Sequence, residues 1–594
     1  MPIQSGVYHH LHHGKKGYEM ASVKLLLATI VGVCVLSVFT ISSAPGTESG
    51  SNSQTSVVDQ DQSDSSLDYR YITGDRYLTI GRPRVVFSED RSQLTCSVAW
   101  DKSWRNGDAF DAAWLFAKAR DESGRWSHVK IIHARQQPQS DGIRAEVRPS
   151  PDGMGVLVSR AEDGQGDNRW IIDFAISPEV PRETIQDIKV FGLEMVHIPQ
   201  GAYDLGTLKS LSDRDEVLTP GAGGAPYNSF HAYSASGKDN YGGIFKVESE
   251  NPIDIGPEEG NLFWVDAEIR GANTFSGIPE GRLGERFPKG YNGFLLMKYE
   301  LSQGEYCDFL NTLTFEQQQA RDISREREFG RTTKDHRNSI QREGRLFYTD
   351  RPHRSCNFIS WRDGLAYADW AGIRHMTELE FEKACRGPEP AVYREYVWGV
   401  NEIAITQNVE FAHRFSDLDG RLANDESGDL RLDGNTHLSF FSYFNLKDVC
   451  SPEGRFYDPN CDACRSFSGG DGGRGPVRRG IFGCDSGGDR IKAGATFYGA
   501  MEMGGNLQEP VVTVGHPNGR RFQGTHGDGR LTPGGDATNA DWIPTDGQYA
   551  YAGRGGAWPY HENHARTADR FKGLRMRPER RASHIGFRGV RSDF

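Results

Sequence analysis

The sequence has 594 residues and a formal net charge of −12 at pH 7. A chain of this length exceeds what one hydrophobic core usually holds, so two folded domains are expected. The acidic balance excludes a general basic surface for nucleic acid. Glycine is frequent, with 70 residues, and 37% of the residues are hydrophobic. This composition favours a globular, loop-rich protein over a helical bundle.

The first 44 residues have the pattern of a leader and an export signal. Lys24 precedes an apolar run over residues 25–41, and the small residues that end at Ala44 fit a cleavage site. Met20 is an alternative start, which would leave the His-rich stretch before it outside the signal. The apolar run is also nearly long enough for an uncleaved membrane anchor. We therefore expect an exported protein, extracellular, periplasmic or at the cell surface, that contacts the membrane only through an uncleaved N-terminal segment.

Two further regions precede the C-terminal part. Residues 45–68 are rich in Ser, Gln, Asp and Gly and are predicted to be a flexible linker. Residues 69–189 contain short β-rich runs separated by polar or glycine-containing turns, which predict an antiparallel, immunoglobulin-like β-sandwich. The runs lie at 77–80, 84–87, 94–100, 113–119, 126–133, 153–158 and 170–176.

The tryptophans of this region allow two interpretations. They are a sugar-binding platform or part of the hydrophobic core, and we favour the core. The five residues concerned are Trp100, Trp104, Trp114, Trp126 and Trp170.

Two glutamates flank a Gly-Gly-Asn turn near the C-terminal end. Glu502 and Glu509 are seven residues apart, and Gly504 and Gly505 allow the backbone to fold back sharply. Two carboxylates beside inward-facing carbonyls suit a hard cation such as calcium. The alternative is a solvated turn with two surface glutamates, and the spacing alone favours this alternative.

Ordered blocks after residue 189 resemble the formylglycine-generating enzyme family, also called the sulfatase-modifying factors. The segment Met503-Gly-Gly-Asn-Leu-Gln-Glu509 resembles the family's GNxWEW segment, and Arg374–Gly387 resembles its RLPTEAEWEKAARG segment. The other similar blocks are residues 191–206, 298–309, 359–370, 397–399, 554–558 and 586–590.

The resemblance implies a fold and a metal site. Residues 190–594 are expected to form a C-type-lectin-like α+β domain with little regular secondary structure. A structural calcium is implied, with the side chains of Glu502 and Glu509 and the carbonyls of Gly505 and Leu507 as ligands. The sequence departs from the family at Glu502, where aspartate or asparagine is usual, and at two positions where Gln508 and Pro510 replace tryptophan.

The residues themselves predict two helices in this region. An apolar stripe made by Ala366, Tyr367 and Trp370 indicates a helix that begins after Ser360. Thr377 and Glu380 have the spacing of a capping box, so a second helix should begin after Thr377. Its core-facing residues would be Leu379, Phe381, Ala384 and Cys385. The charged insertion over residues 317–345 is expected to be helical or mobile.

The catalytic chemistry of the family uses two cysteine thiolates that bind copper and activate oxygen. The register of the sequence places Glu562 and Thr567 at these two positions, and no cysteine follows Cys484. A carboxylate and a hydroxyl cannot replace two soft thiolates as ligands of copper(I). We therefore expect calcium without copper or iron, and a protein that is not an oxidase.

The same segment offers other polar side chains to a cleft. His561 and His564 are candidate metal ligands, although we favour a polar loop. Arg566, Asp569 and Arg570 are expected to form buried ion pairs, with the binding of an anionic ligand as the alternative.

The cysteines fall into two groups. Cys450, Cys461, Cys464 and Cys484 are close in sequence, and in an exported chain we favour disulfides between them over a four-thiolate zinc site. The others are predicted to be free core thiols, namely Cys96, Cys307, Cys356 and Cys385.

The leading hypothesis is an exported, non-catalytic relative of formylglycine-generating enzyme that serves as a binding or structural module at the cell surface. Its partner would be a protein or a glycan, and an oligomer is compatible with the sequence. A dedicated glycan-binding protein and a metal- and oxygen-dependent oxidase with altered ligands remain as alternatives.

Overall fold

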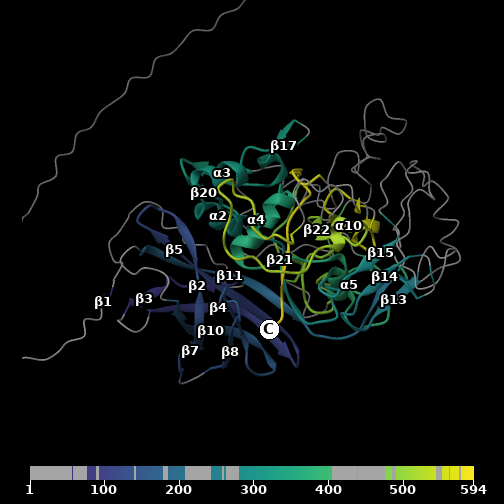
Figure 1. Ribbon diagram of the computed structural model, residues 1–594, viewed down its shortest axis with the longest axis horizontal. Helices are drawn as coiled ribbons and strands as arrows, with labels where there is room; N and C mark the ends of the chain where they lie inside the picture. Colours follow the sequence, from purple (N-terminus) through teal and green to yellow (C-terminus); the bar gives the residue numbers. More distant parts are fainter. Residues whose placement is uncertain are drawn as a thin grey trace, which may run out of the picture. The chain divides into compact units, whose positions relative to one another are not determined.

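Most of the regular structure in the described part of the chain is antiparallel β-sheet, with few helices (Figure 1). This confirms the α+β class. All described residues belong to one unit, Thr55–Phe594. The computed structural model describes residues 56–57, 77–87, 92–139, 142–177, 185–207, 243–256, 258, 260–262, 278, 280–328, 330–403, 436, 438, 475–483, 490–542, 551–560, 562–570, 572–573 and 577–594.

Each of the seven predicted β-rich runs contains strand residues. The strands of this region are β2 (Thr79–Ile80), β3 (Arg84–Phe87), β4 (Ser92–Asn106), β5 (Ala109–Asp121), β6 (Trp126–Val129), β7 (Ile131–Gln136), β8 (Ala145–Pro149), β9 (Val156–Arg160) and β10 (Gly164–Ile176). Strand β8 was not predicted, and it pairs with β9. Within the predicted linker, β1 (Ser56–Val57) pairs with β3.

A long strand, β11 (Ile185–Ile198), joins the two halves of the sequence. It pairs with β5 from Ile185 to Val196, and its last four residues pair with β16 (Phe294–Met297). Strand β16 continues to β25 (Gly589–Ser592), which pairs with β21 (Arg374–His375). The boundary predicted after residue 189 therefore falls inside one strand, and fourteen of the described strands form one sheet.

Strand β5 is buried on both faces because a different core covers each face. Trp114 and Phe116 belong to the core shared with the helices, whereas Ala113, Leu115 and Ala117 belong to the core of the N-terminal strands. Among the tryptophans, Trp100, Trp114 and Trp170 are buried, as the core interpretation predicted, while Trp104 and Trp126 are partly exposed.

Four of the described helices begin at a capping box. The helices are α2 (Gln303–Asn311), α3 (Phe315–Arg321), α4 (Trp361–Ala371), α5 (Glu378–Arg386) and α10 (Pro517–Arg520). Ser360 caps α4 and Thr377 caps α5, so both predicted helix starts are confirmed. The four residues predicted to face the core from α5 are all buried.

The remaining strands form short pairs and one small sheet. They are β12 (Tyr203–Thr207), β13 (Gly243–Val247), β14 (Ile253–Ile255), β15 (Gly281–Leu283), β17 (Arg327–Glu328), β18 (Arg331–Thr332), β19 (Gln341–Glu343), β20 (Leu346–Tyr348), β22 (Glu509–Val512), β23 (Tyr551–Arg554) and β24 (Lys572–Gly573). The charged insertion is α-helical only where it contains the end of α3, and short hairpins follow. No helix among the described residues is long and apolar enough to span a membrane.

Replacing Ser360 with alanine should lower the free energy of unfolding by about 1 kcal/mol. The Ser360 hydroxyl accepts a hydrogen bond from the backbone N–H of Asp363 (3.2 Å) and donates one to the Asp363 carboxylate (2.6 Å). Urea unfolding of Ser360→Ala measures how much this cap contributes to stability. Ser127→Ala is the control, because Ser127 is exposed. Equal midpoints for the two variants would show that the cap does not stabilise α4.

A buried lysine lies between β5 and the helices. Lys118 is 2% exposed, its ammonium group lies over the Trp370 ring, and it donates a hydrogen bond to the carbonyl of Gly529 (3.3 Å). Burial lowers the pKa of Lys118 to about 7, although the nearby carboxylates of Asp369 and Asp528 oppose this shift. The folded protein therefore releases a proton at a pH where the unfolded chain keeps it.

We expect stability to rise between about pH 7 and pH 10.5, because the unfolded state then binds the extra proton. Lys118→Met should remove this rise and should stabilise the protein at pH 6 by on the order of 2–4 kcal/mol. Lys189→Met is the matched control, since Lys189 is exposed and lies opposite Lys118 in the β5–β11 pair. Unfolding by urea at pH 6 and pH 9 gives the measurement, and a loss of stability at pH 6 would contradict the expectation.

Candidate functional site

The predicted Gly-Gly-Asn turn is a sharp reversal just before β22. Glu502 (φ 56°), Gly505 (φ 90°) and Asn506 (φ 54°) all have left-handed backbone conformations. The Asn506 side chain accepts a hydrogen bond from the backbone N–H of Val477 (2.9 Å) and donates to the carboxylate of Glu300 (2.6 Å). The Asn506 side chain thus connects the turn to Val477 and to Glu300.

Close contact with the segment around Gly555 supports this turn. The Gly505 N–H donates to the carbonyl of Gly555 (2.7 Å), and the Trp558 N–H donates to the carbonyl of Asn506 (2.8 Å). Gly555 has φ +79°, and a Cβ atom there would lie 2.4 Å from the carbonyl oxygen of Met503. Only glycine allows the two segments to approach this closely.

Three buried carboxylates gather at the turn, and one of them was not predicted. One oxygen of Glu502 accepts from the Gly480 N–H (2.7 Å), and one oxygen of Glu509 accepts from Arg588 Nε (2.6 Å). The unpredicted carboxylate, Glu300, accepts from the Leu507 N–H (3.0 Å) in addition to Asn506. All three are at most 3% exposed.

The electrostatics of the three carboxylates favour a bound cation. Burial raises the pKa of Glu502 to about 7 and raises that of Glu509. Burial and the adjacent Glu509 raise the pKa of Glu300 well above its usual value. Arg588 is the cation that opposes the shift most strongly at both Glu502 and Glu509. An additional positive charge would therefore stabilise the ionised forms.

The ligand set implied for calcium fits this geometry. The second carboxylate oxygens of Glu502 and Glu509 are buried and have no hydrogen-bond partner among the described residues. Within the same residues, no hydrogen bond reaches the carbonyl of Gly505 or Leu507. Two orphaned carboxylate oxygens and two unused carbonyls are suitable ligands for a hard cation. Bound there, calcium would cross-link the turn to the start of β22.

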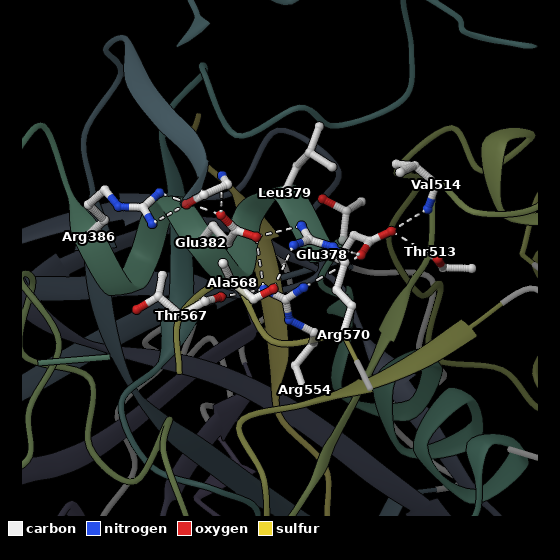
Figure 2. A network of polar contacts seen from close by, with 12 residues as sticks. Glu378, Leu379, Glu382, Arg386, Thr513, Val514, Arg554, Thr567, Ala568 and Arg570 are labelled. Atoms are coloured by element: carbon white, nitrogen blue, oxygen red, sulfur yellow. Dashed lines mark hydrogen bonds and ion pairs between the residues drawn. The ribbon is translucent and has the colours of Figure 1, made fainter. Parts of the chain in front are cut away.

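A second polar cluster lies between α5 and the segment that follows β23 (Figure 2). Glu378 accepts hydrogen bonds from Thr513 Oγ1 (2.9 Å) and the Val514 N–H (2.6 Å) through one oxygen, and from Arg570 Nε (2.8 Å) through the other. Glu382 pairs with Arg554 (3.0 Å) and with Arg570 (2.5 Å). We call Glu378, Glu382, Arg386, Arg554 and Arg570 the α5 network.

The α5 network is fully internal, and Glu395, outside the five, balances its third arginine. Its five side chains are at most 4% exposed, and Arg386 also pairs with Glu395. Burial alone would raise the pKa of Glu382, but Arg570, Arg554 and Arg386 together lower it. Arg554 also donates to the carbonyl of Thr567 (Figure 2). The network therefore fixes the segment around Thr567 against α5.

Part of the chain is similar to a known protein family. Residues 285–430 match the family model described as a sulfatase-modifying factor enzyme 1-like domain. The chain contains a sulfatase-modifying factor domain. It is 47% identical over 55 residues to a formylglycine-generating enzyme of Thermomonospora curvata, and 47% identical over 51 residues to one of Streptomyces coelicolor. These matches cover 9% of this chain and only 17% and 16% of the two relatives.

The two positions equated with the family's cysteines lie outside the matched residues 285–430, and their environments differ. Glu562 is half-buried in a 3₁₀ turn, Glu562–Ala565. Thr567 is 1% exposed, its N–H donates to the carbonyl of Glu395 (3.1 Å), and its hydroxyl has no hydrogen-bond partner among the described residues.

The other residues predicted to line a cleft make contacts of different kinds. His564 Nδ1 lies 2.9 Å from the Asp569 carboxylate, and both side chains are buried. The Arg566 guanidinium lies over the Tyr396 ring, and Arg570 belongs to the α5 network. His561 lies outside the described residues. Within the part of the chain that the structure describes, no group of three or more His, Cys, Asp or Glu side chains is arranged to hold a metal ion.

The structure describes only some of the cysteines. Cys450, Cys461, Cys464 and Cys484 lie outside the described residues, so their pairing stays a prediction. Cys96, Cys307, Cys356 and Cys385 are free and buried, which confirms the prediction made for them. Burial raises the pKa of the Cys96 thiol to about 12 and raises those of the other three well above the usual value. None of the four is therefore a reactive thiolate.

Sequence reasoning missed the residues whose partners are distant along the chain. Glu378 and Glu382 are one turn apart on α5, and this spacing was the available signal. Glu300 and Arg588 carried no local signal, because their partners are about 200 and 80 residues away.

Proposed function

We propose that the protein is an exported, non-catalytic member of the sulfatase-modifying factor family that serves as a binding or structural module at the cell surface. Its C-terminal part is a C-type-lectin-like domain stabilised by calcium, and its N-terminal part is an immunoglobulin-like β-sandwich. Its partner is another protein or a glycan. The leader sequence supports export, because a basic residue, an apolar run and small residues follow one another there.

One observation carries this proposal. The positions equated with the thiolates of the family's oxidases hold Glu562 and Thr567, and no cysteine follows Cys484 in the sequence. The surroundings of Thr567 give further support. Its hydroxyl is buried beside the α5 network, whose charges are matched within the protein. This internal pairing adds no soft ligand for copper.

The test measures the metal content and the oxygen uptake of the protein. Purified protein is analysed for calcium, copper and iron, and oxygen uptake is followed with a cysteine-containing peptide. The formylglycine-generating enzyme of Thermomonospora curvata serves as the active control in the same assay. We expect calcium to be retained and oxygen uptake to equal the peptide-only background. Peptide-dependent oxygen uptake that requires added copper or iron would overturn the proposal in favour of an oxidase with altered ligands.

A further inference from the structure

A short segment of the chain is hydrogen-bonded to the turn that carries the implied calcium ligands. The Val477 N–H donates to the side-chain oxygen of Asn506 (2.9 Å), and the Gly480 N–H donates to Oε1 of Glu502 (2.7 Å). Both donors are backbone groups, so the course of the backbone here determines where the two side chains lie. We call residues 475–483 the bridging segment.

The hydrogen bond from Gly480 gives the two oxygens of Glu502 different roles. Oε1 is held by the bridging segment, whereas Oε2 is buried, has no hydrogen-bond partner among the described residues and is available to a cation. Contacts to the second atom of a ligand group orient that group toward its metal. A shift of Gly480 would therefore move the calcium ligand out of position.

Tyr77 connects the bridging segment to the N-terminal strands. Its hydroxyl donates a hydrogen bond to the carbonyl of Arg479 (2.7 Å) and accepts one from the guanidinium of Arg478 (2.7 Å). Its ring stacks on His353 at 4.1 Å, and the carbonyl of His353 accepts a hydrogen bond from the Arg479 N–H (3.1 Å). One buried side chain thus fixes the two residues that directly precede Gly480.

The position of Tyr77 depends on the docking of β2, which begins two residues later. The Leu78 N–H donates to the carboxylate of Glu194 (2.8 Å), and the Gly81 N–H donates to the carbonyl of Ser97 (2.8 Å). Between these two bonds, β2 pairs with β4. Tyr77 is therefore held by the N-terminal sheet, although it is 402 positions from its acceptor in the bridging segment.

We propose that Tyr77 is a positioning residue of the calcium site, so that calcium binding at Glu502 and the docking of β2 stabilise each other. This inference rests on the calcium site of the proposed function and adds a coupling to it. The connection runs from Tyr77 through Arg479 and Gly480 to Glu502. Because coupling between two sites is reciprocal, loosening of β2 lowers the calcium affinity by the same factor by which calcium strengthens the docking of β2.

The first test is the calcium Kd of the whole protein, measured by titration calorimetry at pH 8. Tyr77→Phe keeps the ring on His353 but loses both hydrogen bonds to the bridging segment, so it should weaken calcium binding about tenfold. Tyr203→Phe is the matched control, because the Tyr203 hydroxyl is also buried and makes two hydrogen bonds, to the carbonyls of Lys289 and Leu379. It should bind calcium with unchanged affinity. An equal Kd for Tyr77→Phe and the unchanged chain, or an equal loss in Tyr203→Phe, would overturn the inference.

Hydrogen exchange gives the reciprocal measurement and needs no variant. In the unchanged chain, calcium should slow the exchange of the Leu78 and Gly81 amides about tenfold relative to EDTA, because these amides exchange through local opening of β2. The amides of β6, another short strand that pairs only with β5 among the described strands, should exchange at the same rate with and without calcium. Equal rates with and without calcium at Leu78 and Gly81 would overturn the inference.

Glu502→Gln separates failure of this inference from failure of the proposed calcium site. Calcium binding that is lost in Glu502→Gln but unchanged in Tyr77→Phe would remove the coupling and leave the site. Calcium binding that is the same in Glu502→Gln and the unchanged chain would remove both. Neither result would change the oxygen-uptake test of the proposed function.

Discussion

Replacing Arg554 with methionine should lower the free energy of unfolding by about 3–5 kcal/mol, because it leaves buried carboxylates without a partner. Arg554 is 1% exposed, lies 3.0 Å from Glu382 and 3.6 Å from Glu378, and covers the ring of Phe381. The measurement is the urea midpoint and slope at pH 7. The exposed Arg125→Met serves as the control, with an expected change within about 0.5 kcal/mol.

A double-variant cycle makes this expectation sharper. Glu382→Gln removes the charge that Arg554 compensates, so the loss in Arg554→Met/Glu382→Gln should be smaller than the sum of the two single losses. Additive losses would show that Arg554 acts through packing on Phe381 and not through the α5 network. A loss below 1 kcal/mol in Arg554→Met would show that water or Arg570 compensates the carboxylates.

Calcium should raise the unfolding temperature at pH 8 and have little effect at pH 5. A ligand at one hundred times its Kd stabilises the folded state by about 2.7 kcal/mol. Because the pKa of Glu502 in the metal-free protein is raised to about 7, the protein without calcium loses stability as the pH rises from the unfolded value near 4.5 through 7. Calcium binds the ionised form and removes that loss, so its effect grows over the same pH window.

Glu502→Gln should abolish the response to calcium and, in EDTA at pH 8, should make the protein more stable than the unchanged chain. Scanning calorimetry at pH 5 and pH 8, with calcium, magnesium or EDTA, gives the measurement. Glu122→Gln is the control, since Glu122 is exposed on the turn after β5. An unchanged calcium response in Glu502→Gln would remove the turn as the calcium site. A calcium response that does not change with pH would contradict the raised pKa of Glu502.

Local signals predicted local structure well. The caps at Ser360 and Thr377 follow from a hydroxyl residue with an acidic residue three positions later, and both boxes form. The β-rich runs followed from alternation and turns, although strand ends such as that of β4 at Asn106 extended beyond them. Burial of Trp104 and Trp126 could not be judged from residue type, because it depends on which neighbours cover each ring.

Long-range structure was less accessible from the sequence. The α5 network joins Glu378 to Arg570, which are 192 positions apart, and no local pattern specifies that pairing. The same holds for a cavity whose walls come from β2, β11 and the helices α2 and α4. Tyr367 was predicted as one residue of an apolar helical stripe, and its side chain is fully buried.

The two-sided pairing of β11 bears on how this protein can be dissected. Cutting the chain between residues 189 and 190 would divide one strand, so each fragment would expose unpaired N–H and C=O groups along a hydrophobic edge. Fragments made on the assumption of two independent modules should therefore aggregate when expressed alone. Co-expressed pieces that share a break in a surface turn offer the better route to studying the two halves separately.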